Sequence, residues 1–503
     1  EISCSLVGSE MCIRDREYLD AKLERYRQKE IYPFHMPGHK RKEHALMDPY
    51  SMDITEIEGF DNLHEPEGIL LEGKERLAEL YGAKESFFLV NGSTCGLLAA
   101  ISAATRRGDT ILMARNCHKA VYHAVELSEL KTEYLYPSIT KEGIQGSIHP
   151  KDVEEALKKH PEIKAVILTS PTYDGVLSDV RTIAGMVHEK NIPLIVDEAH
   201  GAHLGFSESF PASAVSEGAD VVIQSFHKTL PSLTQTAVLH RMSERIAPER
   251  IRKYLSVYQT SSPSYLLMAS IDRCVRILQS RSERYFADLE ENLTTFYRKV
   301  QDLKHLKVLT EEDFSKEEGY AFDPTKILIY TGDTDMTGKE LMDILRKDWD
   351  MELEMASGYY ALALTGIMDT EDGFFSLSEA LHTIDEQMKK TGKDVAVEES
   401  IKIEDENEHV SYLFMQELYG KKEVVYPVWE AEDMRKMEIS LESALGKISA
   451  VTVSLYPPGI PLLLPGERIE NGFLEGIAKC RESGLHISGL SGTSNERIEV
   501  VIP

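Results

Sequence analysis

The sequence predicts an α/β protein with a doubly wound, mostly parallel sheet, followed by a C-terminal α+β region. Between residues 69 and 230, short apolar runs rich in Val and Ile alternate with longer segments of helical periodicity. Polar clusters follow directly after several of these runs, at the carboxyl ends where open α/β sheets bind ligands. After about residue 280 this alternation stops. With 503 residues, the chain is long enough for two or three domains.

The composition is that of a globular protein without a polyanionic partner. Apolar residues make up 42% and charged residues 28% of the chain, which is ordinary for soluble domains. The formal net charge of −28 argues against nucleic acid and anionic membrane surfaces as partners. The six cysteines form no CxxC pair, and no run reaches the ~18 apolar residues of a membrane span. With no secretory signal in the N-terminal sequence, we expect a cytoplasmic protein.

The first 66 residues are predicted to precede the sheet. Residues 1–16 fit no helical or strand pattern, and we expect an extraneous segment or a disordered tail. Residues 17–66 are predicted to form a short helix and an extended loop, because the stretch 32–41 contains two prolines and a glycine. His35 and His39 on this loop suit a metal or phosphate site, or simply an ordered linker, and both alternatives stay open.

The first strand, turn and helix suggest a place for an anion. A helix over residues 69–81 ends at a glycine, a strand covers 87–90 and a helix of small residues covers 95–105. The turn between strand and helix would point backbone N–H groups and the hydroxyls of Ser93 and Thr94 at a phosphate. The alternative is ordinary capping of the helix by one of these two hydroxyls.

The alternation continues through a predicted large domain, residues 67–300. Strands are expected at 110–113, near 134, and at 165–168, 192–196 and 221–223, and helices are expected from about 119, 151 and 180. Polar clusters follow three of the strands. They contain His118 after the second strand, Asp197 after the fifth, and Ser225, His227 and Lys228 after the next one.

Lys228 and Asp197 carry the chemical prediction. A carboxylate that ends an apolar strand is costly to bury without a cationic partner, and a protonated pyridine nitrogen is such a partner. A phosphate cradle, an imidazole, this carboxylate and a lysine, in that order, describe a holder of pyridoxal 5′-phosphate. The simplest alternative is that Lys228 is a surface lysine after a core strand. Asp197–His200 also spells a helicase box, but the chain has no Walker loop and a strongly negative charge. His200 with His203 could form a metal pair, but it lies on a loop where Asp197 is otherwise engaged, so we expect no metal.

The C-terminal region, residues 301–503, is less regular. A long helix is expected from Ser282 to about residue 303, strands are expected at 326–330 and 359–364, and a charged stretch at 390–408 predicts an exposed connection. A final unit contains a predicted strand at 451–455 and a proline-rich loop at 456–461.

Eight motifs, in order, resemble the bacterial pyridoxal-phosphate-dependent ornithine/lysine/arginine decarboxylases, in the short form of the biosynthetic arginine decarboxylases. The motifs are FHMPGHKR (34–41), LVNGSTCG (89–96), ARNCHKAV (114–121), TSPTYDGVLSD (169–179), VDEAHGAH (196–203), QSFHKTLPSLTQTAVLH (224–240), TSSPSY (260–265) and YPPGIPLLLPGE (456–467). The resemblance implies a large domain like that of aspartate aminotransferase and a homodimer, or a higher homo-oligomer, with active sites at the dimer interface.

The resemblance also implies a role for each residue. Lys228 would bind the cofactor aldehyde, Asp197 would keep the ring nitrogen protonated, and His118 would stack on the ring. His227 or the freed Lys228 would then protonate the α-carbon. Around them the cofactor would contact Ser93, Thr94, Ala199, His200, Ser225 and His227, and Thr260 would reach the phosphate of the neighbouring subunit. Glu467 and His35 are candidate substrate contacts, with a surface carboxylate as the alternative for Glu467. One departure is Ala120, where the family often has Ser.

The function expected from this resemblance is α-decarboxylation of a basic amino acid. Arginine, giving agmatine and carbon dioxide, is favoured over lysine and ornithine, which would give cadaverine and putrescine, because of the short form. An aminotransferase would need an arginine placed for the α-carboxylate, and the sequence leaves this alternative open. A non-catalytic binding protein with this fold would need a broken site, whereas Lys228 and Asp197 are both present.

Overall fold

The structure is a computed structural model, and it describes residues 28–29, 31–42, 49–332, 334–390, 418–455, 459–482, 487–492 and 495–502. The predicted extraneous segment 1–16, the helix expected after residue 17 and residues 391–408 of the expected connection lie outside these ranges. In the described part of the chain, no helix combines the length and apolarity needed to cross a membrane.

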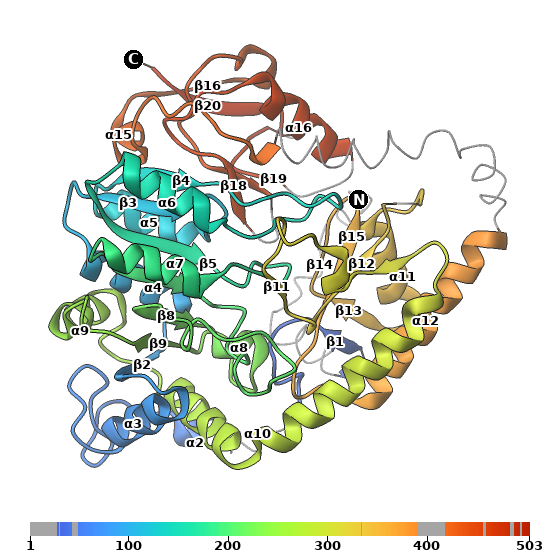
Figure 1. The fold of residues 1–503 in the computed structure, drawn as a ribbon, viewed down its shortest axis with the longest axis horizontal. Helices are drawn as coiled ribbons and strands as arrows, with labels where there is room; N and C mark the ends of the chain where they lie inside the picture. Colours follow the sequence, from blue (N-terminus) through green and yellow to red (C-terminus); the bar gives the residue numbers. More distant parts are fainter. Residues whose placement is uncertain are drawn as a thin grey trace, which may run out of the picture.

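A seven-stranded sheet forms the centre of the large domain (Figure 1). Six strands run in the same direction, and only β9 is antiparallel to its neighbours β2 and β8. In spatial order the strands are β2 (Glu85–Leu89), β9 (Ala237–Arg241), β8 (Val221–Gln224), β7 (Leu194–Asp197), β5 (Ile163–Thr169), β3 (Thr110–Ala114) and β4 (Lys131–Leu135). The predicted mostly parallel, doubly wound α/β fold is therefore confirmed.

Helices cover the sheet, so its central strands are largely buried and consist mainly of apolar residues. The helices of this domain are α3 (Ile69–Tyr81), α4 (Gly92–Ala104), α5 (Lys119–Leu127), α6 (Pro150–Lys159), α7 (Val180–Glu189), α8 (Phe226–Thr229) and α9 (Pro248–Tyr258), with a short α2 (Pro49–Met52) before them. The small residues of α4 allow close packing. A Cβ atom on Gly96 would lie 2.6 Å from Leu89 and 3.1 Å from Ile223 of the sheet.

The long helix α10 (Tyr265–Lys299) begins earlier than the predicted start at Ser282. Ser264 caps it, since its hydroxyl accepts a hydrogen bond from the backbone N–H of Leu267. The polar stretch at 279–284 resembles a break in the sequence, but apolar residues on both sides of it keep the helix in one piece. The buried apolar residues include Met268, Ile271, Cys274, Val275 and Leu278 before this stretch, and Phe286, Leu289, Leu293 and Phe296 after it.

A second, smaller sheet follows α10, with strand order β10-β12-β15-β14. Its strands are β10 (Lys307–Val308), β12 (Lys326–Tyr330), β15 (Tyr360–Leu364) and β14 (Met355–Ala356), and its helices are α11 (Gly338–Asp348) and α12 (Glu371–Lys390). The predicted strands 326–330 and 359–364 are β12 and β15. The short pair β6 (Val176–Leu177) and β11 (Ala321–Phe322) ties this domain to the large one.

The C-terminal unit lies beside the β4 edge of the large sheet, where α15 contacts α5 (Figure 1). Its elements are α15 (Val428–Asp433), β16 (Lys436–Ser440), β17 (Val453–Leu455), β18 (Ile460–Leu463), α16 (Asn471–Glu482), β19 (Ile487–Ser488) and β20 (Arg497–Val501). They enclose an apolar cluster of their own, which includes Phe473 and Ile477.

The N-terminal loop joins the smaller domain to the turn that carries Lys228. Strand β1 (Tyr32–Phe34) pairs in parallel with β13 (Met351–Leu353). Further along the loop, the backbone N–H of Gly38 donates to the carbonyl of His227 in α8 at 2.8 Å. A Cβ atom on Gly38 would lie only 2.7 Å from the Leu230 carbonyl oxygen, so this close approach requires glycine.

Replacing Gly38 by Ala should therefore push the loop away from α8. We expect the free energy of unfolding, measured in urea, to fall by about 1–3 kcal/mol, as for other overpacked sites. Gly185→Ala in α7 is the control, because open space surrounds this glycine. A Gly38→Ala protein as stable as the Gly185→Ala protein would contradict the close contact.

Candidate active site

The carboxyl ends of β2, β3, β7 and β8 lie along one edge of the sheet, because these strands run in the same direction. The segments that follow them carry Ser93, His118, Asp197 and Lys228. Residues far apart in the sequence are thereby brought to one rim, as expected for ligand sites of open α/β sheets.

Lys228 lies in the four-residue helix α8, directly after β8. Its Nζ is 2.9 Å from Nε2 of His200. Burial lowers the pKa of Lys228, while the nearby carboxylates of Asp197 and Glu354 act in the opposite direction. The result is an amine that loses its proton more readily than an ordinary lysine, as a nucleophile requires.

Asp197 is the last residue of β7 and is 3% exposed. Its Oδ1 accepts a hydrogen bond from the backbone N–H of Ala199 at 3.2 Å. Burial raises the pKa of Asp197, and the positive charge of Lys228 opposes this shift. A carboxylate in this position gains stability from any further cation placed beside it, such as a protonated ring nitrogen.

Two neutral histidines flank this pair. His118 caps α5, and its Nδ1 accepts a hydrogen bond from the backbone N–H of Ala120, so the departure from Ser at position 120 leaves this contact intact. The ring of His227 donates from Nδ1 to the carbonyl of Thr236 at 2.8 Å. Burial lowers the pKa of both imidazoles to about 4, so both are neutral at pH 7.

Among the residues that the structure describes, the predicted phosphate side contains one buried donor without a partner, the hydroxyl of Ser225. Asn91 occupies the N-cap position of α4, so Ser93 and Thr94 lie in its first turn and the alternative of capping by either hydroxyl is wrong. Within the described residues, the Oγ of Ser225 is fully buried and has no hydrogen-bond partner. A buried hydroxyl left unpaired is unfavourable unless a ligand satisfies it, which fits a phosphate group here.

Thr260 lies on an exposed loop next to the first turn of α4. Its backbone N–H is 3.4 Å from Oδ1 of Asn91, and its carbonyl is 3.0 Å from Nε2 of His64. The loop therefore lies beside the predicted phosphate cradle of its own chain, and its outer face is open to solvent.

Glu467 does not present a free carboxylate to the residues around Lys228. It is 1% exposed and forms an ion pair with Arg115, with Oε2 3.1 Å from Nη2. Arg115 also donates to the carbonyl of Pro461 at 2.9 Å. The alternative of a surface carboxylate is therefore wrong, and a cation of the protein already neutralises Glu467 where the C-terminal unit meets the large domain.

Three residues near Lys228 were not predicted as site residues. Glu354 accepts hydrogen bonds from the hydroxyl of Tyr173 at 2.5 Å and from the backbone N–H of Met36 at 2.8 Å. Burial lowers the pKa of His35, and the charge of Glu354 opposes this shift. Lys326 is fully buried, with Nζ 2.8 Å from Nδ1 of His200. The only sequence signal for Lys326 is a cation at the start of an apolar strand. Tyr173 lies within the motif at 169–179, and Glu354 has no signal.

The residues of the helicase-like stretch 197–200 and of the pair His200 and His203 make different contacts. Glu198 accepts hydrogen bonds from Ser213 and Gln224, both within 2.7 Å, and burial raises its pKa to about 7. His203 pairs with Asp323 at 3.2 Å, whereas His200 lies between two lysines. Neither the helicase-box residues nor the two histidines therefore act as a unit.

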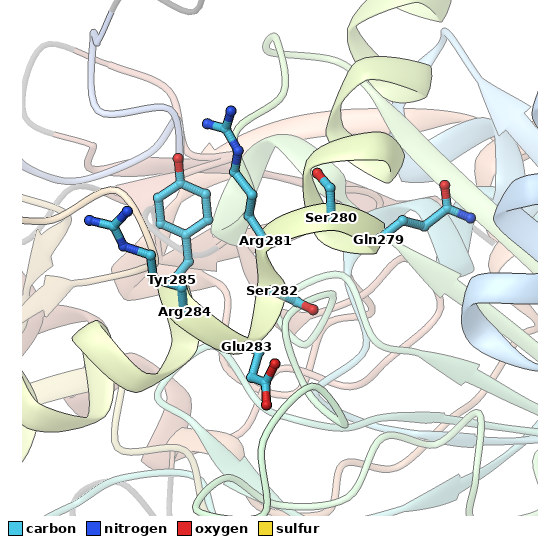
Figure 2. A pocket seen from close by; sticks show the side chains of 7 residues that line it. All are labelled: Gln279, Ser280, Arg281, Ser282, Glu283, Arg284 and Tyr285. Carbon is cyan, nitrogen blue, oxygen red and sulfur yellow. The ribbon is translucent and has the colours of Figure 1, made fainter.

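A hollow of about 580 Å³ lies elsewhere, along residues 279–285 of α10 (Figure 2). In Figure 2 its side chains, among them Arg281, Glu283 and Tyr285, extend in different directions from one helical segment. It contains none of the predicted site residues, so we regard it as a surface feature of α10.

Comparison with known proteins identifies the family. The profile of "Orn/Lys/Arg decarboxylase, major domain" matches residues 19–346, and that of the C-terminal domain matches residues 428–489. The chain belongs to the Orn/Lys/Arg decarboxylase family. It is 33% identical over 500 residues to "Uncharacterized protein YaaO" of Bacillus subtilis, covering 95% of this chain and 97% of that protein. It is 30% identical over 490 residues to the arginine decarboxylase of the same organism, covering 95% and 96%.

Solved structures agree on the fold. The lysine decarboxylase LdcF of Francisella novicida superposes with a TM-score of 0.74 at 18% identity, covering 97% of this chain and 84% of that one. The constitutive lysine decarboxylase of Escherichia coli gives 0.72 at 21% identity, covering 86% and 74%. An alanine–glyoxylate aminotransferase from Nostoc gives 0.50 at 15% identity over 63% of this chain and 86% of that one, so the large domain has the expected aminotransferase-like fold.

This family member is a carboxy-lyase that uses pyridoxal 5′-phosphate. The residues at the rim fit this cofactor on three counts. Lys228 offers an amine with a lowered pKa, Asp197 offers a buried carboxylate for the ring nitrogen, and Ser225 offers an unpaired hydroxyl beside the first turn of α8.

Glu467→Ala tests the structural assignment of that residue. Because it would leave the guanidinium of Arg115 buried and unpaired, we expect a loss of about 3–5 kcal/mol in the free energy of unfolding, measured in urea. Glu423→Ala, which removes an exposed pair with Arg468, is the control and should change stability little. An unchanged stability with a raised KM would instead return Glu467 to the substrate site.

Proposed function

We propose that this protein removes the α-carboxylate of arginine, giving agmatine and carbon dioxide. The observation that carries the reaction type is the match to the Orn/Lys/Arg decarboxylase family, and the amine of Lys228 close to the buried carboxylate of Asp197 supports the use of the cofactor. The choice of arginine is supported by the arginine decarboxylase of Bacillus subtilis, which matches along 95% of this chain. Lysine remains the second candidate, since the constitutive lysine decarboxylase of Escherichia coli is 23% identical over 92% of the chain.

Each residue at the rim has a distinct task in this proposal. When bound, the cofactor supplies a conjugated ring that accepts the electron pair left by departing carbon dioxide. Asp197 would favour a proton on the ring nitrogen, and the neutral ring of His118 would lie against one face. Ser93, Thr94 and Ser225 would donate to the phosphate.

The arrangement favours Lys228 over His227 as the donor of the proton that replaces the carboxylate. His227 is neutral at pH 7, and its one ring proton, on Nδ1, is held by the carbonyl of Thr236. Its Nε2 can therefore accept a hydrogen bond but not donate one. Lys228 can carry a proton and give it up, because burial lowers its pKa.

Glu354 is the carboxylate that we propose for the distal cation of the substrate. It acts electrostatically on both Lys228 and Lys326, which places it near the reactive amine. The hydroxyl of Tyr173 and the N–H of Met36 hold its two oxygens in place. His35, which precedes Met36 on the N-terminal loop, also lies close to Glu354.

We also propose that the working enzyme is a homodimer. Thr260 lies on an exposed loop beside the first turn of α4, so a second copy that covers this face would bring its own Thr260 loop near the phosphate cradle. We further propose that residues 67–300 form the cofactor-binding large domain and that residues 301–503 form a C-terminal α+β region.

Lys228→Ala should abolish both cofactor capture and turnover. We expect the visible absorbance of the lysine-bound cofactor to disappear and carbon dioxide release from arginine to fall by at least roughly 10²–10⁴-fold. Lys151→Ala, at an exposed position of α6, is the control. Release from arginine, lysine and ornithine is compared in parallel. Formation of a keto acid in place of carbon dioxide would select the aminotransferase alternative.

Glu354→Gln should raise the KM for arginine about tenfold or more, since a charge-assisted hydrogen bond is lost, with a smaller change in kcat. Norleucine, which lacks the distal cation, should be handled equally by the two proteins. Glu352→Gln is the matched control, because Glu352 pairs with Arg346 instead. Equal effects on arginine and norleucine would remove Glu354 from substrate recognition.

A further inference from the structure

A lysine occupies a core position in helix α3. The buried side of this helix consists of Leu70, Gly73, Lys74, Leu77 and Tyr81, which follow the helical repeat that normally places apolar residues in a core. Lys74 is only 7% exposed, and a lysine is rarely buried this deeply unless it is paired. An apolar side chain would therefore be expected at this position.

The side chain of Lys74 lines a cavity of about 220 Å³ at the outer edge of the large sheet. The cavity lies beside β2, the edge strand of this sheet, and between residues of α3 and α9. Most of its wall is apolar, and this part is formed by Leu63, Pro66, Leu71, Phe87, Phe88 and Leu255. A cation buried against such a wall is costly unless an anion accompanies it.

The protein itself gives the Lys74 ammonium group no direct anion. In the part of the chain that the structure describes, Lys74 Nζ takes part in neither a hydrogen bond nor an ion pair, and it lies 4.5 Å from the centre of the Phe87 ring. The ring face attracts the cation but offers no oxygen to accept its N–H groups. Lys74 therefore presents unused donors to the cavity.

The two nearest carboxylates are engaged elsewhere. Oε1 of Glu85 accepts hydrogen bonds from Nε and Nη2 of Arg252 at 3.1 and 2.8 Å, and Oε2 lies 3.4 Å from Nε of Arg241. Both oxygens of Asp61 accept hydrogen bonds from backbone N–H groups of the loop before α3 and of its first turn. Glu85 and Asp61 therefore act on Lys74 only from a distance.

The charge and the wall define the class of ligand. One ammonium group with three N–H donors matches one carboxylate, whereas a phosphate dianion would need further donors that an apolar wall lacks. The rest of the wall suits a hydrocarbon body. The volume corresponds to about seven water molecules at ~30 Å³ each, which is enough for a carboxylate with a short carbon chain.

We propose that this cavity is a binding site for a small monocarboxylate, with Lys74 as the cation that pairs with the carboxylate and the apolar wall around the hydrocarbon body. The electrostatics agree with this geometry. Burial lowers the pKa of Lys74, and the charge of Glu85 opposes this shift. A bound carboxylate would oppose it further and keep the ammonium charged.

Two residues of the cavity wall bond to the segments around the predicted phosphate cradle. Oε1 of Gln259 accepts a hydrogen bond from the backbone N–H of Val90 at 2.9 Å, just before the N-cap of α4. Nε2 of His64 lies 3.0 Å from the carbonyl oxygen of Thr260. The test therefore uses the full-length protein with its cofactor bound, so that the probe cannot occupy the phosphate cradle instead.

The probe is hexanoate, and its binding is followed by titration with NMR detection of the probe signals. We expect saturable binding with a Kd of about 1 mM or lower. Hexanamide has the same shape but no charge, and it should bind at least about tenfold more weakly, as should inorganic phosphate. Turnover of arginine is not measured, so the result is independent of the proposed function.

Lys74→Met should weaken hexanoate binding at least about tenfold and leave hexanamide binding unchanged. The variant should be no less stable in urea than the wild type without ligand, because it removes a buried cation that has no direct partner. Lys253→Met removes an exposed lysine of α9 next to Arg252, and this control should bind hexanoate as the wild type does.

Glu85→Gln tests the sign of the electrostatic effect. Glu85 is the one acidic residue among those that line the cavity in the described structure, and its replacement leaves Arg252 and Arg241 in place. We therefore expect tighter binding of hexanoate and an unchanged affinity for hexanamide. Weaker binding of hexanoate to Glu85→Gln would contradict the proposed pairing.

Three results would overturn the site. The first is equal affinity of the wild type and Lys74→Met for hexanoate. The second is equal affinity of the wild type for hexanoate and hexanamide, which decides the matter even if Lys74→Met does not fold. The third is no binding to the wild type at concentrations about tenfold above the expected Kd, which would assign the counter-charge of Lys74 to another source, such as a carboxylate of a second copy of the chain.

Discussion

The candidate site depends on the burial of two groups, the amine of Lys228 and the carboxylate of Asp197, away from water. Asp197 ends β7, and Lys228 follows the adjacent parallel strand β8. Burial moves their pKa values toward each other, down for the amine and up for the acid. Neither shift is possible on a solvated surface. The apolar sheet beneath and the loops above serve the same end, since they exclude the water that would restore ordinary ionisation.

Segments that are distant in the sequence cover the sheet edge that carries Lys228 and Asp197. The N-terminal loop reaches the Lys228 turn through Gly38 and the carboxylate of Glu354 through Met36, while β1 is paired to β13 of the smaller domain. Strands β6 and β11 bring Tyr173 and Asp174 toward Lys326. The smaller domain and the N-terminal loop therefore form one cover, and its polar groups are held by hydrogen bonds to the large domain.

Glu467 and the polar stretch of α10 show that a local sequence pattern can predict the wrong environment for a residue. Glu467 follows a Pro-Gly turn and looked like a free carboxylate, but Arg115, more than 350 positions earlier, neutralises it in a buried pair. The polar stretch in α10 looked like a helix start, yet apolar residues on both sides pack on the same core. In both cases the deciding partner is remote in the sequence, so no local pattern contains it.

The sequence by itself determined the alternating α/β order, the positions of six of the seven strands of the large sheet, with β9 missed, and the clusters that contain Lys228, Asp197 and His118. These follow from short-range periodicity and from the rule that parallel strands expose their carboxyl ends on one edge. Only the tertiary structure decided that Glu354 and Lys326 lie beside the reactive amine and that His200 lies between two lysines. Those contacts join separate domains, and their energies come from burial and long-range pairing, which residue type and spacing do not encode.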